Sequence, residues 1–144
     1  MPNNPQQDVI FNTITAPLGD ELNWRWEEPM SALLAEFSWE KKERVLAQLR
    51  KLFSDEWNNK NIKKAPKALK EELGELARLN KKQLIFTRPA TAETPALAMI
   101  WWPWGHGATY SMRIKVLNIN YSAEDIKQAQ TSLLSKIFNF AKSD

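Results

Sequence analysis

The pattern of apolar and polar positions is clearest in the last third of the chain. Three segments rich in β-branched, aromatic and aliphatic residues, 83–88, 96–104 and 109–121, are separated by the turn-like sequences PATAETP and GHGA. Short apolar segments between such turn signals are typical of strands. The sequence therefore predicts a three-stranded antiparallel meander. Its middle segment is apolar almost throughout, so we expect it to be covered on both faces.

In the third of these strands the apolar positions shift by one residue. Met112, Ile114 and Val116 share one face of an extended chain, whereas Leu117 and Ile119 share the other. Two explanations fit this shift. One is a β-bulge near Val116, and the other is a strand buried first on one side and then on the other.

The N-terminal part of the chain predicts a smaller pair of strands. Segment 8–15 is rich in β-branched residues, and segment 22–28 alternates between apolar and polar side chains. A proline and a glycine between the two segments suit a reverse turn. We therefore expect an N-terminal β-hairpin, in which Trp24 and Trp26 point to the same face.

Helical periodicity in the middle of the chain predicts two helices. Apolar side chains between Ser31 and Trp57 fall on one stripe, with lysine and arginine opposite. We expect this helix to begin either at about Ser31 or afresh at Ser38. Pro66 suits the first turn of a second helix, which is expected to end near Asn80. The two helices would then form an antiparallel hairpin.

A capping box predicts where the last helix begins. The sequence SAED places a serine three residues before an aspartate, the spacing at which each side chain accepts a hydrogen bond from the other residue's amide. The inner face of this helix is predicted to hold Ile126, Ala129, Leu133, Ile137 and Phe140.

These elements predict an α+β fold in the order ββ-αα-βββ-α. The sheet, made of the N-terminal hairpin and the three-stranded meander, is expected to be mostly antiparallel, with helices packed mainly on one face. With 144 residues the chain has the size of one domain. Residues 1–7, which hold two prolines, predict a disordered tail ahead of a single domain at 8–144.

Composition excludes several classes of site. The chain has no cysteine and one histidine, which excludes disulfides, thiol nucleophiles and the usual zinc and iron–sulfur sites. Its four glycines form no phosphate-binding motif. We therefore expect no metal and no other cofactor. No apolar run has the length of a membrane helix and the N-terminus lacks a signal-peptide pattern, so we expect a cytoplasmic protein without a membrane partner.

Tryptophan is the most unusual feature of the composition. The chain has seven, and three of them lie in WWPWGHG, residues 101–107. If helices cover only one face of the sheet, a row of these aromatics faces outward, as in a binding hot spot. The sequence therefore predicts a small non-enzymatic binding or regulatory protein that contacts an unknown protein, or itself in a homodimer. The predicted partner-binding residues are Trp24, Trp26, Trp101, Trp102, Trp104 and His106.

Nucleic-acid binding is the main alternative. Residues 1–40 carry seven acidic residues and one basic residue, whereas residues 41–89 carry fourteen lysines and arginines and six acidic residues. Weak, sequence-independent binding would use segment 41–70. Its predicted contacts are Lys60, Lys63, Lys64 and Lys67. Two other interpretations stay open: the acidic segment folds over the basic helices, or the lysines form an ordinary solvated face.

An enzyme of unknown class is the third possibility. His106 lies between two glycines in a predicted hairpin loop, which is a mobile place for a general base. No spacing of acidic residues favours a pair of catalytic carboxylates. The sequence therefore predicts no catalytic residue.

Overall fold

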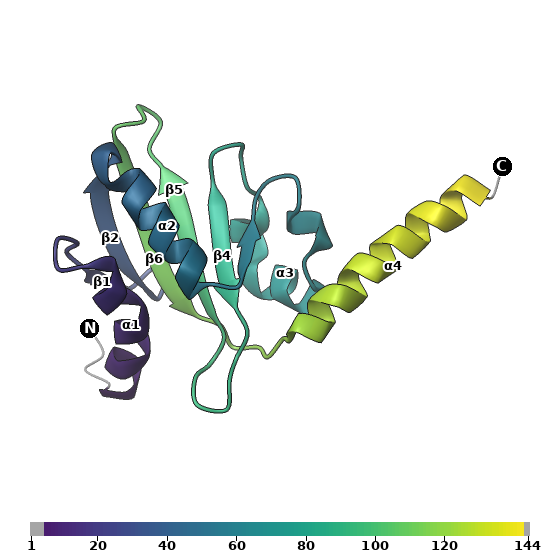
Figure 1. The fold of residues 1–144 in the computed structure, drawn as a ribbon, viewed down its shortest axis with the longest axis horizontal. Coiled ribbons are helices and arrows are strands. Elements are labelled where there is room, and N and C mark those ends of the chain that lie inside the picture. Colours follow the sequence, from purple (N-terminus) through teal and green to yellow (C-terminus); the bar gives the residue numbers. More distant parts are fainter. Residues whose placement is uncertain (1–4, 143–144) are drawn as a thin grey trace.

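A computed structural model describes the backbone of residues 5–142 and the side chains of residues 7–135. Figure 1 shows the fold. With η denoting a 3-10 helix, the elements in chain order are α1 (Pro5–Leu18), β1 (Arg25–Glu27), β2 (Ala32–Ser38), η1 (Trp39–Lys41), α2 (Lys42–Leu52), β3 (Asp55–Trp57), η2 (Ile62–Lys64), α3 (Lys67–Leu73), η3 (Gly74–Ala77), β4 (Leu84–Arg88), β5 (Leu97–Pro103), β6 (Thr109–Val116) and α4 (Ala123–Lys142).

The strands form one antiparallel sheet in the order β1-β2-β6-β5-β4-β3. This confirms the predicted α+β class and the antiparallel sheet, which has six strands instead of the expected five. The predicted meander is β4, β5 and β6, with Met99 of β5 opposite both Phe86 of β4 and Ile114 of β6. Residues 97–101 of β5 are all buried, as the apolar sequence of this strand predicts.

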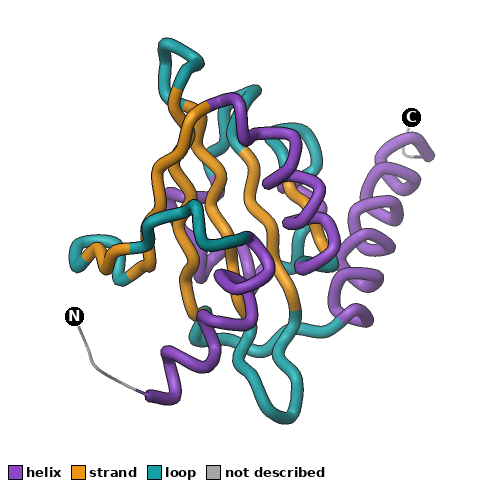
Figure 2. The backbone as a smooth tube through the Cα atoms, turned by 60° about the vertical axis from the view of Figure 1, so that its left-hand side comes forward, coloured by secondary structure: helices purple, strands orange, loops and turns teal. Residues whose placement is uncertain are grey.

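Helices lie on both faces of the sheet (Figure 1, Figure 2). α1 and α2 pack on one face, where Phe11 and Leu49 belong to the first core. α3 packs on the opposite face, where Leu69 joins Ile85 and Ile100 in a second core. We expected helices mainly on one face of the sheet. α1 and α2 agree with this expectation, whereas α3 packs on the other face. Among the described residues, the strand side chains of the second core come from β3, β4 and β5 alone, so the same face of β1, β2 and β6 lies outside this core.

The predicted N-terminal hairpin is wrong, because segment 8–15 lies in α1. Phe11, Ile14 and Leu18 follow one another at spacings of three and four residues, which places them on one side of a helix, and all three are buried in the first core. A β-branched composition favours a strand only weakly, and here the helical spacing of the buried residues prevails. Segment 22–28 does contain a strand, β1, but its partner is β2.

A short turn joins β1 to β2. The amide of Ser31 donates to the carbonyl of Glu28 at 3.0 Å, and Ser31 has a φ of 47°. Pro29 lies in this turn, just after the end of β1.

Of the predicted disordered tail, residues 1–4 lie outside the described residues, and residues 5–7 begin α1.

Of the two predicted starts of the helix between Ser31 and Trp57, the one at Ser31 is wrong, and the one at Ser38 agrees with the structure, because η1 begins directly after Ser38 and continues into α2. The predicted extension to Trp57 is also wrong. The segment forms the strands β2 and β3, and α2 between them is only eleven residues long. In β2, Ala35 and Phe37 are buried on one face, and Leu34 is also buried on the face that carries Glu36, so the two-residue alternation of a half-exposed strand is interrupted at Leu34. Since α2 and α3 lie on opposite faces of the sheet, the predicted helical hairpin does not form.

The predicted starts of the last two α-helices are confirmed. α3 begins directly after Pro66 and ends earlier than predicted, at Leu73, where Gly74 adopts a φ of 56° and η3 follows. At α4, the amide of Ser122 donates to Asp125 Oδ2 at 2.7 Å, and the amide of Asp125 donates to Ser122 Oγ at 3.1 Å. This pair of hydrogen bonds is the predicted capping box.

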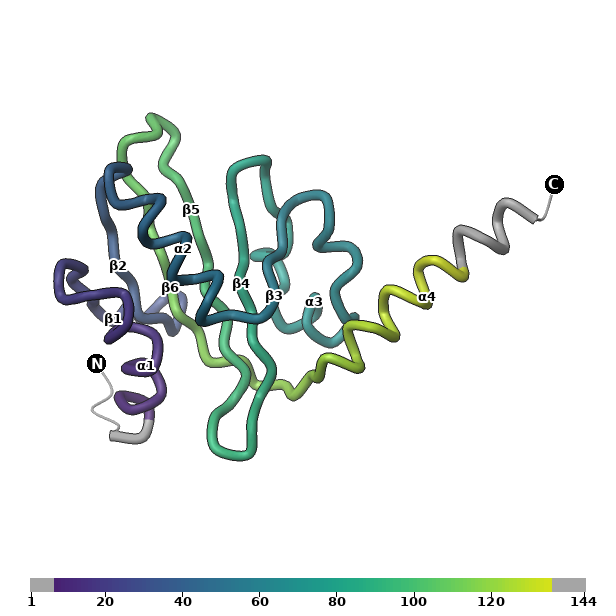
Figure 3. Tube along the Cα trace, in the orientation of Figure 1, coloured from purple at the N-terminus to yellow at the C-terminus, as the bar shows by residue number. Residues whose placement is uncertain are grey.

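α4 extends away from the sheet (Figure 1, Figure 3). On its predicted inner face, Ile126 packs against the second core, and Ala129 and Leu133 are half-buried. The side chains of Ile137 and Phe140 lie outside the described residues. In the part of the chain that the structure describes, no helix has both the length and the apolar character needed to cross a membrane.

The shift of apolar positions near Val116 coincides with the end of β6. Met112 and Ile114 belong to the first core, whereas Leu117 and Tyr121 are buried in the second. The chain therefore crosses from one face of the sheet to the other as it leaves the strand. Of the two predicted explanations, burial first on one side and then on the other is the correct one.

Candidate functional site

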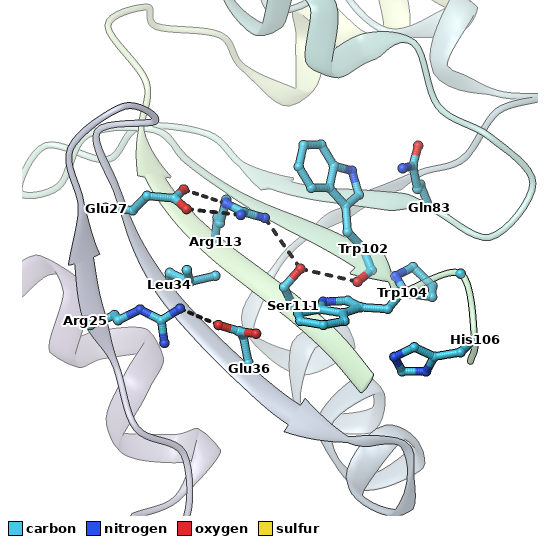
Figure 4. Close-up of a pocket in the computed structure, with 12 residues that line it drawn as sticks. Arg25, Glu27, Leu34, Glu36, Gln83, Trp102, Trp104, His106, Ser111 and Arg113 are labelled. Atoms are coloured by element: carbon cyan, nitrogen blue, oxygen red, sulfur yellow. Dashed lines mark hydrogen bonds and ion pairs between the residues drawn. The ribbon is translucent and has the colours of Figure 1, made fainter. Parts of the chain in front are cut away.

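Part of the sheet is open on the face that carries α3. There, side chains of β1, β2, β5 and β6 line a shallow, open concavity of about 590 Å³ (Figure 4). We call this region, together with the hairpin loop at 104–108, the open sheet face. Its lining is dominated by two tryptophans, a histidine, two arginines and two glutamates: Trp102, Trp104, His106, Arg25, Arg113, Glu27 and Glu36.

Strand pairing explains why these side chains meet. Side chains alternate between the two faces along a strand, and residues directly opposite each other share a face. Leu34 of β2 lies opposite Arg113 of β6. In the next row, Ser111 of β6 lies opposite both Glu36 of β2 and Trp102 of β5. The pairing thus brings residues from distant parts of the sequence onto one surface.

Arg113 is the most firmly held charged group of the open sheet face. Its Nε donates to Glu27 Oε1 at 2.6 Å and its Nη2 donates to Glu27 Oε2 at 3.1 Å, a bidentate ion pair. The guanidinium carbon lies 4.9 Å from the centre of the Trp102 ring, within the range of a cation–π contact. The two charged side chains are only 14% and 22% exposed. The pair therefore ties β1 to β6 across β2 in a shielded position.

The pKa of Glu27 follows from this pairing. The hydrogen bonds from Arg113 lower the pKa of Glu27, and they outweigh burial, which acts in the opposite direction. The Glu27 carboxylate is therefore charged at neutral pH and serves as a hydrogen-bond acceptor. A carboxylate in this state is poorly suited to act as a general acid.

The second ion pair of the open sheet face is more exposed. Nη2 of Arg25 donates to Oε1 of Glu36 on the neighbouring strand, and the two side chains are 62% and 28% exposed. Exposed pairs of this kind contribute at most about 1 kcal/mol to stability. Both groups are therefore available to a partner at little cost to the fold.

The hairpin loop places two rings beside the concavity. The ring centres of Trp104 and His106 lie 5.7 Å apart, and Trp104 is 44% exposed. The amide of Ala108 donates to His106 Nδ1 at 3.0 Å, which assigns the proton of the neutral ring to Nε2. The amide of Gly107, which has a φ of 79°, donates to the carbonyl of Trp104 at 2.9 Å. These hydrogen bonds fix the predicted hairpin end.

No family model, curated protein or solved structure matches this chain. Within the described residues, no three acidic or histidine side chains come together as metal ligands.

Three of the six predicted partner-binding residues lie at the open sheet face: Trp102, Trp104 and His106. Trp101 points to the opposite side of β5, where it is 2% exposed and its ring centre lies 5.6 Å from that of Phe37. The prediction that Trp101 contacts a partner is therefore corrected. Its side chain is part of the first core.

Trp24 and Trp26 also belong to the first core. Both are half-buried against it, and the ring centre of Trp26 lies 6.3 Å from that of Phe11 in α1. The predicted single row of outward-facing aromatics is thus divided. Trp24 and Trp26 pack against the core beneath α1 and α2, whereas Trp102 and Trp104 line the concavity on the other face of the sheet.

The charged half of the site is missing from the sequence prediction. Arg25, Glu27, Glu36 and Arg113 are brought together only by the pairing of β1, β2 and β6, which the sequence does not reveal. The available signal was the alternation within β6, which places Ser111 and Arg113 on the face opposite Met112. Trp39, which is 54% exposed, lies next to the hairpin loop but outside the lining of the concavity, and its amide donates to the carbonyl of Ala108.

The predicted nucleic-acid contacts form a separate exposed cluster near η2. It comprises Lys60, Lys63, Lys64 and Lys67, which we call the lysine cluster. Nζ of Lys67 lies 3.8 Å from Oε1 of Glu71, one helical turn further along α3. A second concavity, of about 350 Å³, is lined by Lys63 and Lys64 together with Leu133 and Leu134 of α4.

The acidic N-terminal segment partly neutralises the basic side chains at the start of α2. Glu21 lies 3.5 Å from both Lys41 Nζ and Arg44 Nη2. In addition, Arg44 donates to the carbonyl of Leu18 at the end of α1. The lysine cluster borders the second core on the other face of the sheet. The predicted masking of basic residues therefore applies to the region of α2 and not to the lysine cluster.

Proposed function

We propose that this protein is a non-enzymatic binding protein and that the open sheet face is its contact surface for a protein partner. One observation carries the proposal: about half of one sheet face has no helix on it within the described residues, and Trp102, Trp104 and Arg113 converge there around a concavity. An uncovered sheet face of this composition differs from an ordinary solvated surface.

The residue types of the open sheet face favour binding. Tryptophan and arginine dominate the energetics of protein interfaces, since each combines a large contact area with a polar group. Here Trp102 and Arg113 are already held together by the cation–π contact, and Glu27 fixes Arg113 from the other side. A partner would therefore meet a preorganised surface and lose little side-chain entropy on binding.

Site-specific photocrosslinking in the native host tests this proposal. A photoreactive amino acid at His106, which is exposed and lines the concavity, is expected to form a covalent adduct with a discrete protein. The same probe at Lys127 on α4 serves as the control position. The adduct at position 106 should disappear when Trp104→Ala is added, because the exposed indole is the proposed anchor. Equal adducts at both positions, or none at position 106, would contradict the proposal.

Nucleic-acid binding through the lysine cluster is a second candidate. It is favoured by one observation: Lys60, Lys63 and Lys64 are exposed, and among the described residues none of them has an acidic partner. Fluorescence anisotropy with a single-stranded oligonucleotide at several salt concentrations tests it. Lys63→Gln with Lys64→Gln should weaken binding and reduce the salt slope by about 0.7 for each phosphate that is no longer neutralised. The control is Lys81→Gln with Lys82→Gln, which should leave the slope unchanged.

A further inference from the structure

We propose that the partner at the open sheet face is a second copy of this chain, related by a two-fold axis. In this interface Trp104 of each copy enters the concavity of the other, and Arg25 of one copy pairs with Glu36 of the other. The inference rests on the proposed function, because it requires the open sheet face to bind protein. It adds the identity of that protein.

The open sheet face carries balanced charges, which favours a second copy as its partner. The concavity is lined by two arginines, Arg25 and Arg113, and by two glutamates, Glu27 and Glu36. A surface with equal numbers of both signs attracts neither a strongly acidic nor a strongly basic partner. A two-fold axis can make such a surface complement itself, because a contact between Arg25 of one copy and Glu36 of the other is repeated by symmetry as a contact between Glu36 and Arg25.

The two ion pairs have different roles in this arrangement. Glu27 and Arg113 are shielded and bidentate, so they stay paired within each chain. Arg25 and Glu36 are more exposed, and their pairing within the chain contributes little. Exchanging this pair between copies keeps the number of ion pairs constant and removes both groups from water. The desolvation of both groups offsets much of the gain from the new pairs, so the exchange contributes to the specificity of the contact more than to its affinity.

The shape of the open sheet face also favours a second copy as its partner. A protruding Trp104 and a concavity floored by Trp102 lie on the same surface. Under a two-fold axis both are used in both copies, which closes the assembly at two chains. An apolar helix as partner would find few aliphatic groups, since Leu34 and Pro103 are the main ones in the lining.

Sedimentation equilibrium of the full chain, from low micromolar to near-millimolar concentration, tests the inference. The wild type is expected to show a reversible monomer–dimer equilibrium. Arg25→Glu and Glu36→Arg should each weaken the dimer at least about tenfold, because like charges then face each other across the interface. An equimolar mixture of these two variants should regain dimerisation, since both contacts of the mixed dimer join opposite charges.

A matched control comes from the opposite edge of the sheet. Arg50 and Glu56 form a similar ion pair, with side chains 54% and 34% exposed. Arg50→Glu and Glu56→Arg should leave the dimer unchanged, and circular dichroism should show that all four variants are folded. If charge reversal at Arg50 or Glu56 weakens the dimer as much as reversal at Arg25 or Glu36, the proposed contact is wrong.

Three further outcomes would overturn the inference. They are a wild type that stays monomeric at every concentration, a mixture of Arg25→Glu and Glu36→Arg that does not regain dimerisation, and a monomeric chain whose adduct at position 106 contains a different protein. The last outcome leaves the proposed function intact while the second copy is excluded. Absence of any adduct at position 106 contradicts both.

Discussion

Two half-buried carboxylates, Glu27 and Asp55, have pKa values that are moved in opposite directions. Hydrogen bonds from Arg113 lower the pKa of Glu27. At Asp55, the first residue of β3, burial raises the pKa, and the hydrogen bonds from the hydroxyls of Ser54 and Tyr121 offset this only in part. The free energy of unfolding therefore depends on pH with opposite signs at these two residues.

Glu27→Gln is expected to destabilise the fold at neutral pH by about 1 to 2 kcal/mol, because shielded Arg113 loses its charged acceptor. Since the folded pKa of Glu27 is lowered, this stabilisation is present above the unfolded pKa and is lost as the pH falls through the folded pKa. Urea denaturation of the wild type and the variant should show a difference that shrinks on acidification. As the control, Glu36→Gln in the exposed pair should cost about 0.5 kcal/mol or less. A difference at Glu27 that stays constant with pH would contradict its lowered pKa.

Asp55→Asn is expected to stabilise the fold at neutral pH by up to about 1 kcal/mol, because the amide oxygen accepts the Tyr121 hydroxyl without burying a charge. The folded pKa of Asp55 is raised, so the folded state binds the proton more tightly and stability decreases as the pH rises from the unfolded to the folded pKa. The gain from the variant should therefore disappear in acid, where wild-type Asp55 is protonated. A gain of the same size at low pH would show that charge is not its cause.

At the scale of elements, α1 is the element whose assignment differs most from its sequence pattern. Its buried positions, Phe11, Ile14 and Leu18, define a helix, whereas its β-branched residues predict a strand. The segment would expose different side chains as a helix and as a strand. In α1, Val9 is one of the most exposed apolar residues and Ile14 is fully buried.

Ile14→Ala is expected to lower the free energy of unfolding by about 2 to 4 kcal/mol, as is usual when a fully buried isoleucine is truncated. Val9→Ala should change it by about 0.5 kcal/mol or less, because the side chain is exposed and alanine favours a helix. Thermal or chemical denaturation of both variants measures this contrast. Similar losses at the two positions would mean that the segment is not packed as α1.

What the sequence predicts about elements depends on how each is buried. The β4–β5–β6 meander and the capping box at Ser122 are local signals, and the sequence predicts both. It does not predict β2, because the apolar run at residues 32–35 puts apolar residues on both faces of the strand and removes the alternation that distinguishes a strand from a helix. The charged half of the site follows from the pairing of β2 with β1 and β6. An error in the assignment of β2 therefore conceals Arg25, Glu27 and Glu36 as site residues.

At the scale of the whole molecule, unequal coverage of the sheet determines where a partner can bind. α1 and α2 pack on one face, and α3 covers only part of the other (Figure 2). The remaining part carries Leu34, which is buried although neither core includes it. Arg25 and Arg113 lie directly opposite Leu34 on the two neighbouring strands, where the aliphatic stem of an arginine typically covers apolar surface. The open sheet face thus combines a buried leucine with aromatic and charged side chains, and tryptophan and arginine are residue types enriched at the centre of interfaces.

The two most exposed tryptophans allow this arrangement to be tested in the intact molecule. Trp39 and Trp104 are 54% and 44% exposed, but only Trp104 lines the concavity. In dilute solution, acrylamide should quench the emission of both. At concentrations where the chain dimerises, Trp104 should become protected and Trp39 should stay accessible, because only Trp104 enters the second copy. Comparing Trp39→Phe with Trp104→Phe assigns the signal: quenching should fall with concentration in the first variant and stay constant in the second. Protection of Trp39 alone would place the contact outside the open sheet face.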